Sequence, residues 1–225
     1  MRRTFYQKHK AGFDRINGLL LTNPVLERGL VLAPVIVASL SCKNSFILGL
    51  SFLLITFFTV LISSFISKKI PYTIRIILYA LIACVLYVPT AMLMDFWFPN
   101  TLFNIGVFLP LLVANSLIVV KSESRFHRHK RGYMIVDLFC HTLGFFLAIM
   151  LVGMLREFIG SGSLFGVPLR ENLTVPAVLY PFSGFILVGF LAAIVKQIKF
   201  RLENPRPRKR RYGEIERENK GRILQ

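Results

Sequence analysis

The sequence predicts an all-α, polytopic membrane protein with six transmembrane helices, in a 3+3 inverted-topology repeat with both termini cytoplasmic. Three observations predict this class. Of the 225 residues, 54% are hydrophobic, which leaves too little polar sequence to cover a soluble domain of this size. The apolar residues form runs of roughly 20, the length that crosses about 30 Å of hydrocarbon as a helix. Basic residues gather in alternate connections between the runs, as the positive-inside rule requires.

The six runs are joined by short connections and therefore form one membrane domain, residues 23–199. A basic tail precedes this domain (1–22) and another follows it (200–225). The runs are continuous rather than alternating, which excludes a β-barrel. In chain order they cover residues 25–42, 46–66, 74–95, 101–120, 134–155 and 176–198.

The charge distribution predicts the orientation. With the N-terminus inside, 25 of the 28 Lys and Arg residues lie on the cytoplasmic side, and the outer side has only Lys43, Arg156 and Arg170. Membrane orientation thus accounts for the net charge of +17, so we expect lipid and no nucleic acid as a partner. The basic C-terminal tail either binds anionic lipid headgroups or only fixes the orientation of the sixth run.

Two short stretches indicate an internal repeat. GLVLAPVIVAS (29–39) lies in the first run and GVFLPLLVANS (106–116) in the fourth, and each has a Gly, a central Pro and a Ser at its end. Three spans per unit is an odd number, so two such units point in opposite directions across the membrane. The stretches therefore predict two related three-helix halves.

Both stretches contain a proline, Pro34 and Pro110. Proline removes one backbone donor and frees a carbonyl one turn earlier, and within a bilayer those groups need protein or a cavity beside them. A matched pair of broken helices predicts a site near the membrane midplane. The alternative is a pair of kinks that only bend the helices. Asn115 and Ser116 would then form hydrogen bonds between helices instead of lining a site.

The cytoplasmic end of the fifth run carries Asp137 and His141, four residues apart and so on one helix face. An intramembrane carboxylate is costly unless it is paired or hydrated. The pair is therefore either a polar entrance for a cation or proton, or an interfacial pair in the headgroup region. Glu123, after the fourth run, either pairs with Arg75 or Lys121 on the inner face or is a solvated charge at the membrane interface.

The outer end of the fifth run carries Arg156 and Glu157, followed by GSGSLFG. Adjacent helical residues do not face each other, so we expect them to reach different partners. They either contact a partner subunit or an ion path, or they mark the end of the helix. No catalytic motif such as HExxH and no phosphate-binding loop is present, so we expect neither catalytic residues nor a metal site in this chain.

Four segments of the chain occur in the order and with the spacing of a known family. They are NPVLERGLVLAP (23–34), TIRIILYALIA (73–83), FNIGVFLPLLVANSLIVVKSES (103–124) and REFIGSGSLFG (156–166). Together they resemble the E subunit of the Rnf (Rsx) electron-transport complex and the D subunit of the sodium-pumping NADH:quinone reductase, Nqr, over about residues 20–198. The resemblance implies a bacterial plasma-membrane subunit that pairs with a homologous subunit of opposite orientation and works with flavin-bearing subunits. It also implies a [2Fe–2S] cluster between the pair, and electron transfer coupled to Na⁺ or H⁺ movement.

The chain departs from the family at the two positions where the resemblance implies cluster cysteines. Ala33 stands before Pro34 and Ser116 follows Asn115. Alanine cannot ligate iron, and a serine hydroxyl is a poor substitute for a thiolate. The three cysteines lie in other parts of the chain, and we interpret it as a divergent member whose cofactor is left open. The alternative is a cluster-less paralogue that acts as a small carrier or an assembly scaffold. The cysteines are Cys42, Cys84 and Cys140.

Overall fold

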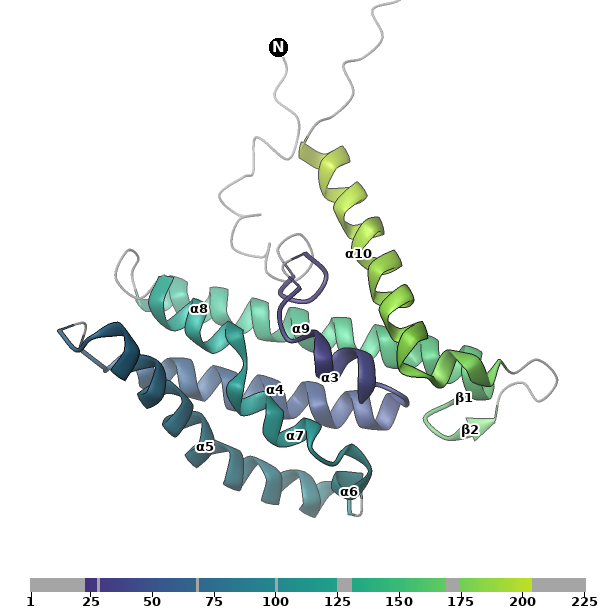
Figure 1. Ribbon diagram of the computed structural model, residues 1–225, viewed down its shortest axis with the longest axis horizontal. Coiled ribbons are helices and arrows are strands. Elements are labelled where there is room, and N and C mark those ends of the chain that lie inside the picture. The colour runs from purple at the N-terminus through teal and green to yellow at the C-terminus, as the bar shows by residue number, and fades with distance from the viewer. Residues whose placement is uncertain are drawn as a thin grey trace, which may run out of the picture.

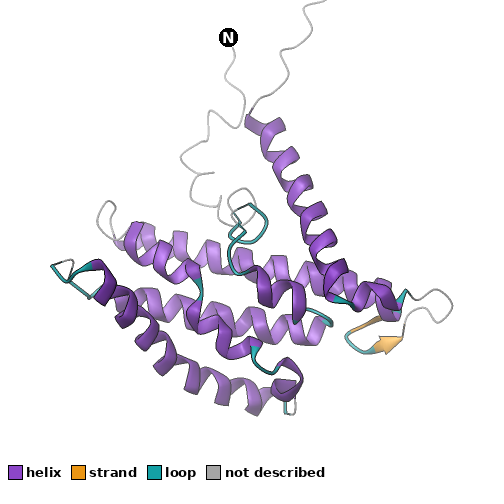
Figure 2. Cartoon of the chain, viewed as in Figure 1, coloured by secondary structure: helices purple, strands orange, loops and turns teal. Residues whose placement is uncertain are grey.

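The computed structural model describes residues 23–27, 29–67, 69–99, 101–124, 131–168 and 175–203. Most of the described chain is helical, and its strands form one short two-stranded ribbon; turns and loops make up the rest (Figure 2). The tail predicted at 1–22 lies outside the described residues, as does 204–225 of the tail predicted at 200–225, whereas residues 200–203 continue the last helix.

Among the residues that the structure describes, four helices are long and apolar enough to cross a membrane. They coincide with the second, third, fifth and sixth predicted runs, which confirms a helical membrane protein. Their bounds are α4 (Cys42–Ser63), α5 (Tyr72–Trp97), α9 (Arg131–Ser161) and α10 (Pro181–Glu203).

The first and fourth runs are broken into short pieces instead of forming continuous helices. In the described part of the first run the only helix is α3 (Leu32–Val37). The fourth run consists of α6 (Thr101–Ile105), α7 (Phe108–Leu111), the 3₁₀ turn η1 (Leu112–Ala114) and α8 (Ser116–Ser124). Of these pieces, α6, η1 and α8 contact α4, whereas α3 contacts α7 and α10.

The two prolines occupy equivalent places in these pieces. Pro34 is the third residue of α3 and Pro110 the third residue of α7. The first turn of a helix has no intrahelical use for its N–H groups, so proline costs less there than in a helix interior. A glycine in the left-handed region, a conformation that glycine adopts at no steric cost, lies five residues before Pro34 (Gly29, φ 63°) and four residues before Pro110 (Gly106, φ 57°). Val31, the N-cap of α3, also has a positive φ of 58°.

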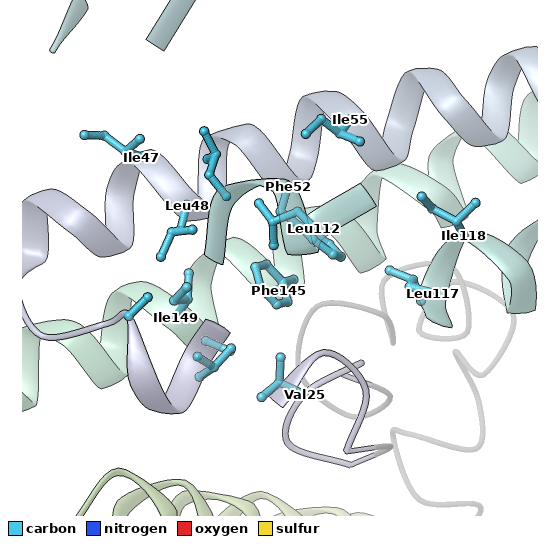
Figure 3. Packing of buried hydrophobic residues seen from close by; sticks show 14 of the residues in the cluster. Val25, Ile47, Leu48, Phe52, Ile55, Leu112, Leu117, Ile118, Phe145 and Ile149 are labelled. Atoms are coloured by element: carbon cyan, nitrogen blue, oxygen red, sulfur yellow. The ribbon is translucent and has the colours of Figure 1, made fainter. Parts of the chain in front are cut away.

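The core lies between the antiparallel helices α4 and α9, which run side by side (Figure 1). The rings of Phe52 and Phe145 stack with centroids 3.8 Å apart, and both side chains are fully buried. Leu112 from η1 packs against them, so the broken run contributes to the same core (Figure 3). Close packing of this kind is what holds helices together where lipid removes the hydrophobic driving force.

The chain after α9 turns back through a ribbon and a 3₁₀ turn. The strands β1 (Ser163–Leu164) and β2 (Val167–Pro168) are antiparallel, and η2 (Pro176–Leu179) precedes α10. Helix α10 leaves the other helices at a steep angle (Figure 1), and most of its apolar surface is exposed. A groove of about 590 Å³ lies between its C-terminal half and residues 26–27.

Candidate functional site

Polar side chains gather at the two ends of α4. Cys42, its first residue, contacts Glu157, and Ser63, its last residue, contacts Ser122. The 22 residues of α4 span about 33 Å at 1.5 Å per residue, close to the thickness of a hydrocarbon core. The two polar clusters therefore lie at opposite faces of the expected membrane slab.

Arg156 is completely buried and ties two short helices to α9. Its guanidinium donates to the carbonyl oxygens of Ile36 at 2.5 Å and Leu179 at 2.7 Å, and more loosely to those of Ser39, Val178 and Tyr180. These carbonyls close the C-terminal ends of α3 and η2, where backbone acceptors lack intrahelical partners and carry negative partial charge. Arg156 thus acts as a shared cap for both helices.

Glu157, the next residue of α9, contacts the chain on the far side of the interval between α3 and α4, at the start of α4. Its carboxylate accepts hydrogen bonds from the backbone N–H of Cys42 at 2.5 Å and of Gly166 at 2.9 Å, and from the hydroxyl of Ser163 at 3.3 Å. A carboxylate at the N-terminus of α4 satisfies free donors and favours the helix dipole. As expected from the sequence, Arg156 and Glu157 reach different partners, and those partners flank the interval between α3 and α4.

At the opposite end, Lys121 of α8 and Asp137 of α9 form a buried ion pair. The ammonium lies 2.8 Å from a carboxylate oxygen, and each side chain is 4% exposed. His141 lies one turn along α9, with Nδ1 2.8 Å from the carbonyl of Asp137 and 3.5 Å from its carboxylate. Asp137 and His141 share one face, as the sequence predicted, and the carboxylate is paired rather than exposed to water.

The two residues after Lys121 fasten α8 to two further helices. The hydroxyls of Ser122 and Ser63 of α4 lie 2.8 Å apart. Glu123 pairs with Arg75 of α5 at 3.0 Å and accepts a hydrogen bond from the hydroxyl of Tyr79 at 2.9 Å. Of the two partners that the sequence offered Glu123, the structure selects Arg75. Three consecutive residues thus connect the end of α8 to α9, α4 and α5.

Asn115 lies at the junction between η1 and α8, and its side chain stabilises this junction. Its side-chain oxygen accepts a hydrogen bond from the N–H of Ile118 at 3.0 Å, which makes it the N-cap of α8. Its amide donates to the carbonyl of Leu112 at 2.6 Å and to the hydroxyl of Thr56 of α4 at 3.2 Å. The buried amide therefore forms the interhelical hydrogen bonds that were one of its two sequence interpretations.

Replacing Asn115 with alanine is expected to lower the free energy of unfolding by about 1–2 kcal/mol, because α8 loses its cap and α4 loses a hydrogen bond. Asn115→Asp retains the acceptor for Ile118 but loses both donations and buries a carboxylate beside the Leu112 carbonyl, so it should cost at least as much. Thr56→Val removes only the interhelical bond. Unfolding in detergent with added denaturant, measured for all three variants, checks this order. An alanine variant as stable as wild type would contradict the capping role.

Ala33 and Ser116 are both exposed, although each is adjacent in sequence to a buried residue of an interrupted run. Ala33 lies beside buried Pro34, and Ser116 beside buried Asn115. Pro110 is exposed as well, and α3 and α7 lie in contact. The breaks therefore present small side chains on the outside of this chain and not in an internal pocket.

The sequence matches a family model described as "Rnf-Nqr subunit, membrane protein" over residues 14–192. The chain belongs to the Rnf-Nqr family. The E subunit of the proton-translocating ferredoxin:NAD(+) oxidoreductase complex of Clostridium ljungdahlii is 30% identical over 183 residues, which cover 80% of this chain and 85% of that protein. The E subunit of the ion-translocating oxidoreductase complex of Shewanella loihica is 30% identical over 205 residues, with 84% and 88% covered. The E subunit of the Na(+)-translocating ferredoxin:NAD(+) oxidoreductase complex of Acetobacterium woodii is 28% identical over 180 residues, with 79% and 92% covered.

This Rnf-Nqr chain does not offer the donors that an iron–sulfur cluster requires. The positions where the resemblance implies ligands hold Ala33, which has no donor atom, and Ser116, which has a hydroxyl. Its cysteines lie elsewhere: Cys42 begins α4, Cys84 is exposed on α5 and Cys140 is buried in α9. Among the described residues, no three His, Cys, Asp or Glu side chains are grouped to hold a metal ion. The residues therefore do not fit the cluster.

Two structural contacts of this Rnf-Nqr chain escaped the sequence analysis. Asn23 donates from its amide to the carbonyl of Gly144 in the middle of α9 at 2.8 Å and caps its own turn through Val25. The Asn-Pro dipeptide at 23–24 is the signal that predicts such a turn. The Lys121–Asp137 pair has no local signal, because its members lie sixteen positions apart on two different helices.

Proposed function

We propose that the chain is an integral membrane subunit of an Rnf-type complex that couples electron transfer to movement of Na⁺ or H⁺ across the membrane. The observation that carries this proposal is the similarity to the E subunits of three ion-translocating oxidoreductase complexes over about four fifths of the chain. Two interrupted runs beside four continuous helices add support, because matched discontinuous helices are typical of ion-translocating membrane proteins. The chain would act as a non-catalytic subunit.

The proposed topology has six spans in a bacterial plasma membrane, with both tails, 1–22 and 200–225, in the cytoplasm. The left-handed glycines and the prolines at equivalent places in α3 and α7 support two related halves. In this orientation the Lys121–Asp137 pair faces the cytoplasm and Arg156 the outside, in agreement with the distribution of Lys and Arg.

The proposed partners are a homologous membrane subunit of opposite orientation and flavin-bearing subunits of the same complex. The exposed residues Ala33 and Ser116 mark the face we assign to the homologous subunit, because the small side chains there allow close backbone approach. The ion path would enter at Asp137 and His141, which lie at the end of α9 beside α8. Arg156 and Glu157 would position α3 at the far end of that path.

The absence of both cysteine ligands that the family resemblance implies favours a second candidate function. A subunit with Ala33 and Ser116 can keep the scaffold of the complex, or move a small solute, without taking part in electron transfer. The two candidate functions are distinguished by measuring iron and acid-labile sulfide in the purified complex, per copy of this chain. In the Ala33→Cys/Ser116→Cys double variant, a gain of iron would support the family site geometry.

Partner capture tests the proposed function. The full chain, tagged in its native host and extracted in a mild detergent, is expected to bring down a second polytopic Rnf-Nqr subunit and flavin-bearing proteins. Ala33→Trp and Ser116→Trp should reduce the recovered membrane partner roughly tenfold, since one well-placed bulky group at a packed interface costs over 1.4 kcal/mol. Cys84→Trp, on the exposed surface of α5, is the matched control and should leave recovery unchanged. Wild-type chain recovered alone would reject the proposal.

A further inference from the structure

The groove beside the C-terminal half of α10 plays no part in the proposed function. It measures about 590 Å³, and sites for small molecules typically have about 300–1,000 Å³. It lies where α10 diverges from the other helices (Figure 1). Leu26 and Glu27, in the turn before α3, line one side, and α10 supplies the other side.

The groove changes from apolar to cationic along α10. Its lining residues Ala192, Val195, Lys196 and Lys199 are three or four positions apart and so share one helix face. Ala192 and Val195 come first, and Lys199 lies about 10 Å beyond Ala192 at 1.5 Å per residue. Leu26, which is buried, adds apolar surface from the opposite side. An amphipathic molecule therefore fits the groove better than a purely polar one.

The cationic end of the groove has more positive than negative charge. Lys199 pairs with Glu27 across it. Lys196 is exposed, and none of the ion pairs that join described residues involves it. Arg201, in the last turn of α10, adds a further cation at this end. Glu27 is the one carboxylate that lines the groove, so the charge left over suits an anion.

The two lysines lie at the depth of lipid headgroups. Helix α10 begins at Pro181, and Lys196 and Lys199 lie about 22 and 27 Å further along its axis. Because a hydrocarbon core is about 30 Å thick, both ammonium groups reach the interface through their apolar stems. Ala192 and Val195 then lie beside the acyl chains. The proposed topology places this end of α10 at the cytoplasmic leaflet, where anionic lipids give a negative surface potential.

We propose that this groove binds one anionic phospholipid, with its phosphate at Lys196 and Lys199 and an acyl chain along the apolar end. A free phosphate would leave the apolar end uncovered. A partner helix of ordinary apolar composition would bury the Lys196 ammonium without a counter-charge, which is costly. The site depends on the membrane location of the chain and not on electron transfer.

Lipid retention by the full chain tests this proposal. The chain, purified in a neutral detergent, is titrated with phosphatidylglycerol, phosphatidylcholine or inorganic phosphate, and bound lipid is counted per chain by native mass spectrometry. Wild type should retain one phosphatidylglycerol where phosphatidylcholine is lost, and inorganic phosphate should not displace it. Lys196→Gln should weaken phosphatidylglycerol binding about fivefold, the usual contribution of one basic residue. Lys69→Gln, at an exposed lysine between α4 and α5, is the matched control and should leave binding unchanged.

Two further variants test the two ends of the groove. Glu27→Gln removes the carboxylate that competes for Lys199, so it should strengthen phosphatidylglycerol binding, whereas loss of a purely structural ion pair would not. Ala192→Trp fills the apolar end and should weaken binding at least about fivefold. Ala80→Trp, on the exposed surface of α5, is its control.

Several outcomes would overturn the proposal. One is equal retention of the two lipids, and another is a Lys196→Gln chain that binds phosphatidylglycerol as well as Lys69→Gln does. Displacement by inorganic phosphate would show a simple anion site instead. If Ala192→Trp keeps its lipid and loses its membrane partner, the groove is a protein interface. Because lipid counting uses the chain without partners, its failure is distinct from failure of partner capture.

Discussion

Replacing Arg156 with leucine is expected to lower the free energy of unfolding by roughly 3 kcal/mol or more, because charge-assisted hydrogen bonds are strong and the buried carbonyls would lose their donors. The bonds to Ile36 and Leu179 are the shortest of the five. Their loss frees the C-terminal ends of α3 and η2 together, and neither helix is long enough to be stable alone. We therefore expect α3 to detach from α9 while α4 and α9 stay paired.

Denaturant titration of the purified chain measures the stability change, and cysteine accessibility shows where it occurs. Val35 is fully buried in α3, so a Val35→Cys probe, in a background that lacks Cys84, should react slowly with a thiol reagent. Arg156→Leu should raise the reaction rate of this cysteine probe at least tenfold. Arg156→Lys keeps a charge but has fewer donors without the planar fork, and should fall between. A probe that stays protected in the leucine variant would show that α3 is held by packing alone.

Much of the fold could be predicted because bilayer length and hydropathy are local properties of the chain. The four continuous runs became α4, α5, α9 and α10. Pro34 and Pro110 lie in the two runs that break, although Pro89 lies inside α5, which stays continuous. Length and hydropathy do not predict how α10 packs. A helix with apolar residues on many sides has no sequence pattern that indicates which side contacts protein.

The candidate site was less predictable because its contacts join residues far apart in sequence. Spacing on one helix placed Asp137 and His141 together, and adjacency kept Arg156 and Glu157 apart, as the structure has them. No local pattern reveals that Lys121 reaches Asp137. Nor does one reveal that an arginine binds only backbone carbonyls among the contacts described, since carbonyl acceptors exist at every residue.

Replacing Gly153 with leucine is expected to have the second largest effect, also roughly 3 kcal/mol, because it wedges α4 from α9. A Cβ atom at Gly153 would lie 1.9 Å from the hydroxyl of Ser45, 2.8 Å from its Cβ and 3.2 Å from the carbonyl of Ser41. The backbones approach closely at this point, as small residues allow in membrane helices. The helix that would have to move is the one that carries Phe52 of the core.

A double-mutant cycle identifies the cause of that effect. Gly153→Ala should cost about 1–3 kcal/mol through overpacking. Ser45→Gly removes the atoms that the new methyl group meets, so the double variant should be more stable than the sum of the single costs predicts. Gly189→Leu in α10 is the matched control, since a Cβ there meets no atom within 4 Å, and it should leave the midpoint unchanged or raise it slightly. If the free-energy costs of the Ser45 and Gly153 variants are additive, the strain does not arise from contact between these two residues. The close approach of α4 and α9 would then not be the basis of the core.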